Sequence, residues 1–259
     1  MSETVLAPVE SPRRFHFDWV PAVFFHPRQT FAKIASQTRG VWLTPILILS
    51  LTALLQVLVT GSIKQAAALS GEVSLPPNFQ YYSPEQQAQF QQAMAATSGP
   101  VFLYVFPAIV ALFRVWLGWL LVGGLLHLVL TMLGGRGDTG AAMNLVAWAS
   151  LPLALRELVR AAAMYSSKQL ISAPGISGFV TPDGGNLSLF LASLLALVDI
   201  YLVWHAILLI VGVRAGNGIS SAKATGGVLI TLLIVLTIQT LISYFTTKLG
   251  GLTIIRPFF

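Results

Sequence analysis

The main pattern in this chain is a series of long apolar stretches separated by short polar segments. A helix needs about 20 consecutive apolar residues to cross the hydrocarbon core of a bilayer, and only helices or closed barrels satisfy their backbone groups there. The stretches therefore predict an all-α membrane protein, a bundle of five transmembrane helices. The predicted spans are residues 41–62, 108–133, 141–163, 187–212 and 224–246.

Two of these spans contain residues that affect where the helix begins or how apolar it is. The second could begin as early as Val101, because residues 101–113 are also apolar, and Pro107 would then kink or break the longer helix. The fourth is apolar except for Asp199 and His205, so we expect one continuous helix with Asp199 near its centre.

The remaining segments divide the chain around a membrane domain of residues 40–247. Residues 1–16 are polar, lack the apolar core of a signal peptide and predict a disordered tail. Residues 17–39 mix aromatic and basic side chains, which predicts an amphipathic segment in the cytoplasmic interface. Residues 64–100 form a Gln-rich outer loop, and residues 248–259 an outer tail.

Composition supports lipid as the main solvent of this protein. Hydrophobic residues make up 55% of the chain and charged residues 9%, whereas soluble domains carry roughly a quarter charged residues. The absence of cysteine excludes disulfides and thiolate metal sites. The net charge of +6 would suggest nucleic acid in a soluble protein, but the basic residues here flank apolar stretches, so we expect no nucleic-acid partner.

The distribution of Lys and Arg beside the spans predicts the orientation. Cytoplasmic loops of membrane proteins carry an excess of these residues. With a cytoplasmic N-terminus and an outer C-terminus, the larger group of Lys and Arg residues lies inside. Termini on opposite sides require an odd number of spans. The inner group is then Arg13, Arg14, Arg28, Lys33, Arg39, Arg136, Arg214 and Lys223, and the outer group is Lys64, Lys168, Lys248 and Arg256.

Three short motifs in this order resemble the Yip1 domain family, specifically its bacterial branch. They are Pro27-Arg28-Gln29-Thr30-Phe31 before the first span, Leu133-Gly134-Gly135-Arg136-Gly137 after the second, and Ala149-Ser150-Leu151-Pro152 in the third. The resemblance extends from about Phe24 to Phe245 and implies a five-helix bundle with a cytoplasmic N-terminus.

The resemblance also implies a function class. Some bacterial members are linked to ABC export systems, which implies an accessory subunit in the inner (cytoplasmic) membrane and no enzyme activity. Eukaryotic relatives engage Rab-type GTPases and act in vesicle traffic. Their cytoplasmic Asp-Leu-Tyr-Gly-Pro motif is missing from this sequence, so that role is not expected here. The family supplies no catalytic residues, and we expect no cofactor.

Ionisable side chains inside the spans are the main candidates for chemistry, because an unpaired charge in lipid is costly. Asp199 is the first of them, with Arg156 and Arg114 as candidate partners. Arg156 and Arg160 share a helix face, and Glu157 has the spacing to pair with Arg160. Asp199 is either a proton or cation site or half of a structural ion pair.

His127 and His205 are expected at similar depths. They could form a proton relay, but two histidines without a nearby carboxylate make a poor metal site, and hydrogen-bonded packing is the alternative. We predict no metal. Gly212 and Gly216 have the spacing of a helix-packing motif, and a helix cap and loop explain them as well.

Two functions from different classes follow from these patterns. The first is an accessory or scaffold protein that binds a membrane complex, with Pro27, Arg28, Phe31 and Arg136 as interfacial contact candidates; assembly with further copies of the chain stays open. The second is a small ion, proton or solute transporter that uses Asp199 with Arg156 or with the histidines. Five helices leave little room for a substrate pathway in one chain.

Overall fold

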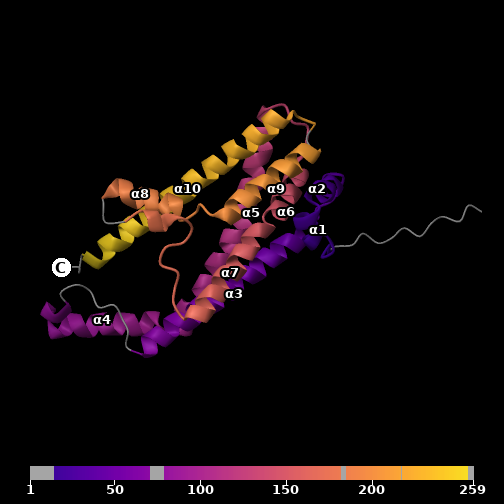
Figure 1. The fold of residues 1–259 in the computed structure, drawn as a ribbon. Helices are drawn as coiled ribbons and strands as arrows, with labels where there is room; N and C mark the ends of the chain where they lie inside the picture. The colour runs from indigo at the N-terminus through magenta and orange to yellow at the C-terminus, as the bar shows by residue number, and fades with distance from the viewer. Residues whose placement is uncertain (1–14, 71–78, 182–184, 217, 256–259) are drawn as a thin grey trace, which may run out of the picture.

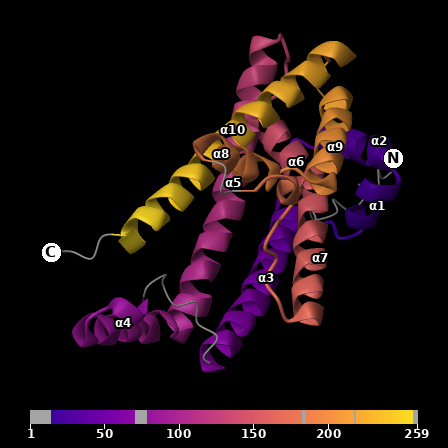
Figure 2. The same cartoon turned by 60° about the vertical axis from the view of Figure 1, so that its left-hand side comes forward.

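The computed structural model describes residues 15–70, 79–181, 185–216 and 218–255, and within these ranges it contains helices and no β-strand (Figures 1 and 2). In chain order the helices are α1 (Trp19–Phe25), α2 (Pro27–Ala35), α3 (Leu43–Leu69), α4 (Pro84–Thr97), α5 (Phe106–Met132), α6 (Thr139–Ala149), α7 (Leu151–Ser167), α8 (Asn186–Leu195), α9 (Ile200–Gly216) and α10 (Ser221–Ile255). Short helical turns are η1 (Phe79–Tyr81), η2 (Val101–Val105) and η3 (Ser177–Phe179).

Four helical segments are long and apolar enough to cross a membrane: α3, η2 with α5, α6 with α7, and α10 as far as Leu249. The pair α8 and α9 passes the same test together but is bent by 59°. The predicted all-helical membrane bundle is confirmed, with four spans or with five if the bent pair counts as one. Large apolar side chains such as Phe113 and Leu233 are exposed on the sides of the bundle, as lipid-facing side chains are.

The fourth span differs from the continuous helix predicted over residues 187–212. α8 ends at Leu195 and α9 begins at Ile200, so Asp199 lies at a break and not near the centre of a helix. Its Oδ1 accepts a hydrogen bond from the Leu202 backbone N–H at 2.9 Å. Aspartate favours such N-terminal capping over a helix interior, which explains why the helix starts again directly after it.

A loop from the preceding connection satisfies the backbone at this break. The N–H of Ile176 donates to the carbonyls of Leu195 (3.1 Å) and Val198 (3.2 Å). Gly175 has a φ of +62°, and a Cβ added to it would lie 2.6 Å from both carbonyl oxygens. Irregular backbone at membrane depth is tolerated only where protein or water satisfies it, so this loop is part of what permits the broken helix.

The second span begins with a π-turn because of Pro107. Proline lacks an N–H and removes one i→i−4 hydrogen bond. The helix before it has the wider π geometry, in which the N–H of Phe106 donates to the carbonyl of Val101, five residues back. The span therefore continues from Val101 to Met132 through a local change of helix type.

Helices α1 and α2 pack on one end of the bundle, where the turns α5–α6 and α9–α10 also lie (Figure 1). We call residues Trp19–Ala35 the α1–α2 platform. α2 lies against α9, where the glycine motif is packing surface: a Cβ on Gly212 would lie 2.9 Å from Phe31 Cδ1, and one on Gly216 2.8 Å from Ala35 Cβ. Small residues at both positions allow this close approach.

The opposite end of the molecule holds α4 and the C-terminal end of α10, so the platform and the last helix end point to different sides of the bundle (Figures 1 and 2). The α5–α6 turn is tight, as its glycines predict. Gly134 has a φ of +89°, and the Gly135 N–H donates to the Leu130 carbonyl at 2.8 Å, which is the Schellman arrangement at a helix C-terminus. Asp138 then caps α6 by accepting from the Ala141 N–H.

Candidate functional site

Four charged side chains meet where α7 faces the break between α8 and α9. We call Arg156, Glu157, Arg160 and Asp199 the charged cluster. Asp199 Oδ2 lies 3.2 Å from Arg160 Nη2 and 3.6 Å from Arg156 Nη1. Arg156 and Arg160 are one helical turn apart, so α7 directs both toward the same carboxylate.

Asp199 has both carboxylate oxygens engaged by the protein. Oδ1 caps α9 through Leu202, while Oδ2 bridges the two arginines of α7. Its side chain is 12% exposed. An ion pair shielded in this way is costly to break, because removal of one partner leaves the other charge buried. The cluster therefore joins α7 to the start of α9.

Glu157 completes the cluster in a way that its sequence spacing does not indicate. Its Oε1 lies 3.2 Å from Nη2 of the adjacent Arg156, and its Oε2 is buried with no hydrogen-bond partner among the described residues. The pairing with Arg160 suggested by the sequence is absent from the ion pairs of the described chain, because Arg160 reaches across to Asp199 instead. Arg156 thus contacts both carboxylates of the cluster.

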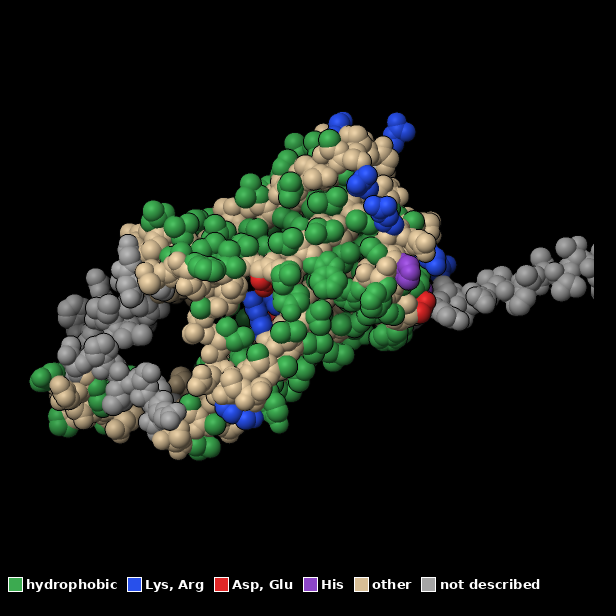
Figure 3. All heavy atoms as spheres, in the orientation of Figure 1, with side chains coloured by type: hydrophobic (Ala, Val, Ile, Leu, Met, Phe, Trp, Pro, Cys, Tyr) green, Lys and Arg blue, Asp and Glu red, His purple; other side chains and the backbone are tan. Residues whose placement is uncertain are grey.

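The space-filling view places charge within an apolar surface. In Figure 3, basic and acidic side chains meet in a recess near the middle of the face, and the other basic side chains in view lie toward the two ends of the molecule. Exposed apolar residues surround this recess on the flanking helices. Charges held at such a depth are kept by pairing with one another, which the distances above provide.

Arg114 lies apart from this pairing. It is exposed on α5, near the middle of the span Val101–Met132. No ion pair among the described residues involves it. Of the two candidate partners for Asp199, the structure places Arg156 in contact with it and Arg114 outside that contact.

The two histidines have different surroundings. His205 on α9 is buried, and its Nδ1 lies 2.8 Å from the carbonyl oxygen of Ala149, the last residue of α6. A carbonyl only accepts, so Nδ1 carries the proton in this hydrogen bond. His127 is half-buried on α5. No group of three side chains suited to a metal ion occurs in the described ranges.

The interfacial candidates separate into buried and exposed residues. Phe31 is fully buried against α9, so it is a packing residue and its ring is not on the surface. Pro27 is half-buried at the start of α2, whereas Arg28 on α2 and Arg136 in the α5–α6 turn are exposed. The exposed basic residues, and not the aromatic one, form the accessible part of this end.

Sequence reasoning did not assign Arg160 to Asp199, although its position one turn after Arg156 was a usable signal. It also did not identify the role of Asn144. This buried amide accepts from the Val41 N–H at 2.9 Å and donates to the Arg39 carbonyl at 3.0 Å. The segment that links the platform to α3 is therefore held against α6. A polar residue in an apolar run was visible, but its partners lie about 100 residues away.

Together the long apolar helices, the broken span and the paired intramembrane charges define a multi-pass α-helical membrane protein. The model of the Yip1 domain family matches residues 22–242, and the chain belongs to this family. Comparison with curated proteins and with solved structures gave no match. The match includes the platform from Ala22 onward, all candidate spans but the last residues of α10, and the whole charged cluster.

Proposed function

We propose that this protein is a non-enzymatic accessory or scaffold protein that associates with another complex in the membrane. The observation that carries the proposal is the α1–α2 platform. Val23, Phe31 and Ile34 are fully buried beneath it, so the two helices are held in one position, while Arg28 and Lys33 are exposed. A fixed basic surface beside the spans offers a partner protein a defined electrostatic docking site.

The use of polar groups inside the bundle supports the same proposal. Asp199 caps a helix and bridges two arginines, and His205 bonds the end of α6. The ion pairs of Asp199 join α7 to the start of α9, and the hydrogen bond of His205 joins α9 to α6. Groups that are committed to helix packing in this way hold a bundle together and are not placed for catalysis on a substrate.

The orientation we propose has the platform in the cytoplasm of a bacterial cell, with the protein in the inner membrane. The basic residues support it, because cytoplasmic ends carry more Lys and Arg. Among the described residues, the platform end carries Arg28, Lys33, Arg39, Arg136, Arg214 and Lys223, and the opposite end carries Lys64, Lys168 and Lys248. The family resemblance suggests an ABC-type export system as the partner.

Reversal of charge on the platform tests this proposal. With the double variant Arg28→Glu and Lys33→Glu, the amount of partner that copurifies in mild detergent is expected to fall about tenfold or more. The partner surface that pairs with these basic side chains would then meet two glutamates of its own charge. Quantitative mass spectrometry of the purified complex measures the ratio. Both side chains are exposed, so the fold is expected to persist.

Lys248→Glu on α10 provides the matched control, because it reverses an exposed charge at the other end of the molecule. It is expected to retain the partner. A partner recovered equally with the platform variant and the control would contradict docking through the platform, and absence of any reproducible partner from the wild-type preparation would contradict an accessory role.

The break between α8 and α9 favours a second function, a small ion, proton or solute transporter. Discontinuous helices with charged residues at the break form the substrate sites of many secondary transporters. If the protein is an accessory protein, wild-type proteoliposomes are expected to show no proton or cation flux above empty liposomes. A flux that is present with the wild-type protein and lost with the folded variant Asp199→Asn would contradict the accessory role and support the transport function.

A further inference from the structure

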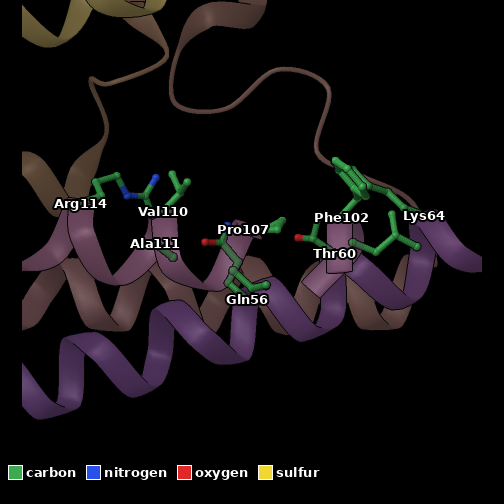
Figure 4. Close-up of a pocket in the computed structure, with 10 residues that line it drawn as sticks. Gln56, Thr60, Lys64, Phe102, Pro107, Val110, Ala111 and Arg114 are labelled. Atoms are coloured by element: carbon green, nitrogen blue, oxygen red, sulfur yellow. The ribbon is translucent and has the colours of Figure 1, made fainter. Parts of the chain in front are cut away.

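A cavity of about 260 Å³ lies between α3 and α5. In Figure 4, Gln56, Thr60 and Lys64 follow one another along α3, and the guanidinium of Arg114 on α5 extends along the cavity toward Val110. The spacing of four residues places the three α3 side chains on one face of that helix. The cavity thus has a cation near each end and two polar side chains between them.

The described residues that line this cavity supply no counter-charge. They number ten and include Lys64 and Arg114 but no Asp or Glu. No ion pair among the described residues involves either cation. Between them, the Thr60 hydroxyl donates to the sulfur of Met164 on α7, at 4.0 Å, and a thioether sulfur is a weak acceptor.

The charged cluster leaves no negative charge for Arg114. Its two arginines and two carboxylates are paired with one another, so its formal charge is zero. An arginine near the middle of a membrane span is costly unless it reaches water, the interface or an anion, and the cavity is where its guanidinium points (Figure 4).

We propose that this cavity binds an anionic phosphate group, held by Arg114 and attracted into the cavity by Lys64. The planar guanidinium donates two parallel hydrogen bonds to a phosphate, and an ammonium group adds a point charge. Gln56 supplies an amide donor on the opposite wall. The phosphate belongs either to a lipid headgroup or to a soluble phosphate.

The apolar walls are suited to a lipid as the source. Val57, Phe102, Leu103 and Val110 line the cavity, and Phe106, Ile109 and Phe113 are exposed on the neighbouring face of α5. An anionic phospholipid would place its headgroup against the cations and its chains along these residues. Basic pockets between transmembrane helices bind anionic headgroups on the cytoplasmic side of membranes, and here Lys64 supplies a cation at the end opposite the platform. This binding is independent of whether the platform docks a partner.

Thermal unfolding of the full chain in nanodiscs tests the site and separates the two sources. One series compares phosphatidylcholine discs with discs that also contain phosphatidylglycerol. A second series adds inorganic phosphate to phosphatidylcholine discs at constant ionic strength, with chloride as the replaced ion. Stabilisation in the first series alone identifies a lipid headgroup, and stabilisation in the second identifies a soluble phosphate.

Arg114→Gln is expected to raise the apparent dissociation constant of the stabilising anion about ten- to a hundredfold, as loss of a charge-assisted hydrogen-bonding partner does. The variant is expected to fold, because Arg114 takes part in no ion pair among the described residues. Arg114→Lys keeps the charge but removes the planar guanidinium that donates two parallel hydrogen bonds, and it should weaken binding less than Arg114→Gln. Arg136→Gln, in the exposed α5–α6 turn, is the matched control and should bind as the wild type does.

Two results would overturn the proposal. One is equal stabilisation of the wild-type protein and Arg114→Gln by the same anion, which would assign the effect to bulk charge at the membrane surface. The other is the absence of any stabilisation of the wild-type protein by either anion across both series.

Discussion

Replacing Asp199 by alanine is expected to lower the free energy of unfolding by about 3 kcal/mol, the lower end of the cost of removing one partner from a buried ion pair, because these side chains are partly buried. Three contacts disappear at once: the cap on Leu202 and the pairs with Arg156 and Arg160. The two arginines would then share only the carboxylate of Glu157, which already contacts Arg156. α7 would lose its tie to the start of α9.

Asp138→Ala is the matched control for this prediction. Asp138 also caps a helix, by accepting from the Ala141 N–H, but it is exposed and no ion pair among the described residues involves it. Its removal should cost about 0.5–2 kcal/mol, the value of a cap alone. SDS-induced unfolding in mixed micelles measures both variants, and the difference isolates the ion pairs of Asp199.

Asp199→Asn refines the result, because asparagine keeps the capping oxygen and removes the charge. It should fall between the wild-type protein and the alanine variant. If Asp199→Ala cost no more than Asp138→Ala, the ion pairs would contribute nothing measurable, and the charged cluster would no longer explain how α7 is joined to α9.

The helical membrane fold could be predicted from the sequence because lipid imposes a simple rule. A span must be apolar on its outside and long enough to cross the hydrocarbon, and α3 and α10 meet that rule with no ambiguity. The rule says little about where a helix breaks. Asp199 was visible as a polar residue in its apolar run, and a continuous helix was predicted through it. The preference of aspartate for a helix N-terminus was the signal that could have located the break between α8 and α9.

The charged cluster was only partly predictable, for a different physical reason. The spacing of Arg156 and Arg160 on one helix face is local and can be read from the chain. Their partner Asp199 lies about 40 residues away, and the choice between Arg114, Arg156 and Arg160 depends on which helices pack together. The structure resolves that choice in favour of α7, which contacts α9 directly.

The packing of the platform shows the same limit in an apolar setting. Gly212 and Gly216 have the spacing of a packing motif, but at a helix end a cap is an equally good explanation. Only the position of α2 decides between them, because Phe31 and Ala35 occupy the space that a side chain would need. Motifs within one element are local signals, whereas their partners are determined by tertiary structure.

Trp148 is the residue in the core whose removal should cost most among the apolar side chains. It is fully buried on α6, its Nε1 donates to the Val41 carbonyl at 3.0 Å, and its ring centroid lies 5.6 Å from that of Trp19. It therefore contacts both the platform and the link to α3. Trp148→Ala is expected to lower the free energy of unfolding by about 3–5 kcal/mol, the usual range for a large aromatic in a core.

Two further variants separate the causes of this loss. Trp148→Phe keeps a ring in the core but leaves the buried Val41 carbonyl without its donor, which should cost about 1–3 kcal/mol. Trp116→Ala is the control, because Trp116 is 38% exposed and packs edge-on against Trp42 and Trp119. Such aromatic pairs contribute about 0.5–1.5 kcal/mol each, so the control should cost less than Trp148→Ala. SDS-induced unfolding in mixed micelles measures all three variants.

The position of Trp148 also links stability to the platform. Because its ring lies under Trp19 of α1 and its indole holds Val41, a cavity at this site should release the platform before the spans separate. Limited proteolysis of Trp148→Ala should therefore cleave first within residues 15–42, under conditions in which Trp116→Ala stays intact. Simultaneous cleavage in the α5–α6 turn and in the platform segment would show instead that the platform and the bundle unfold as one unit.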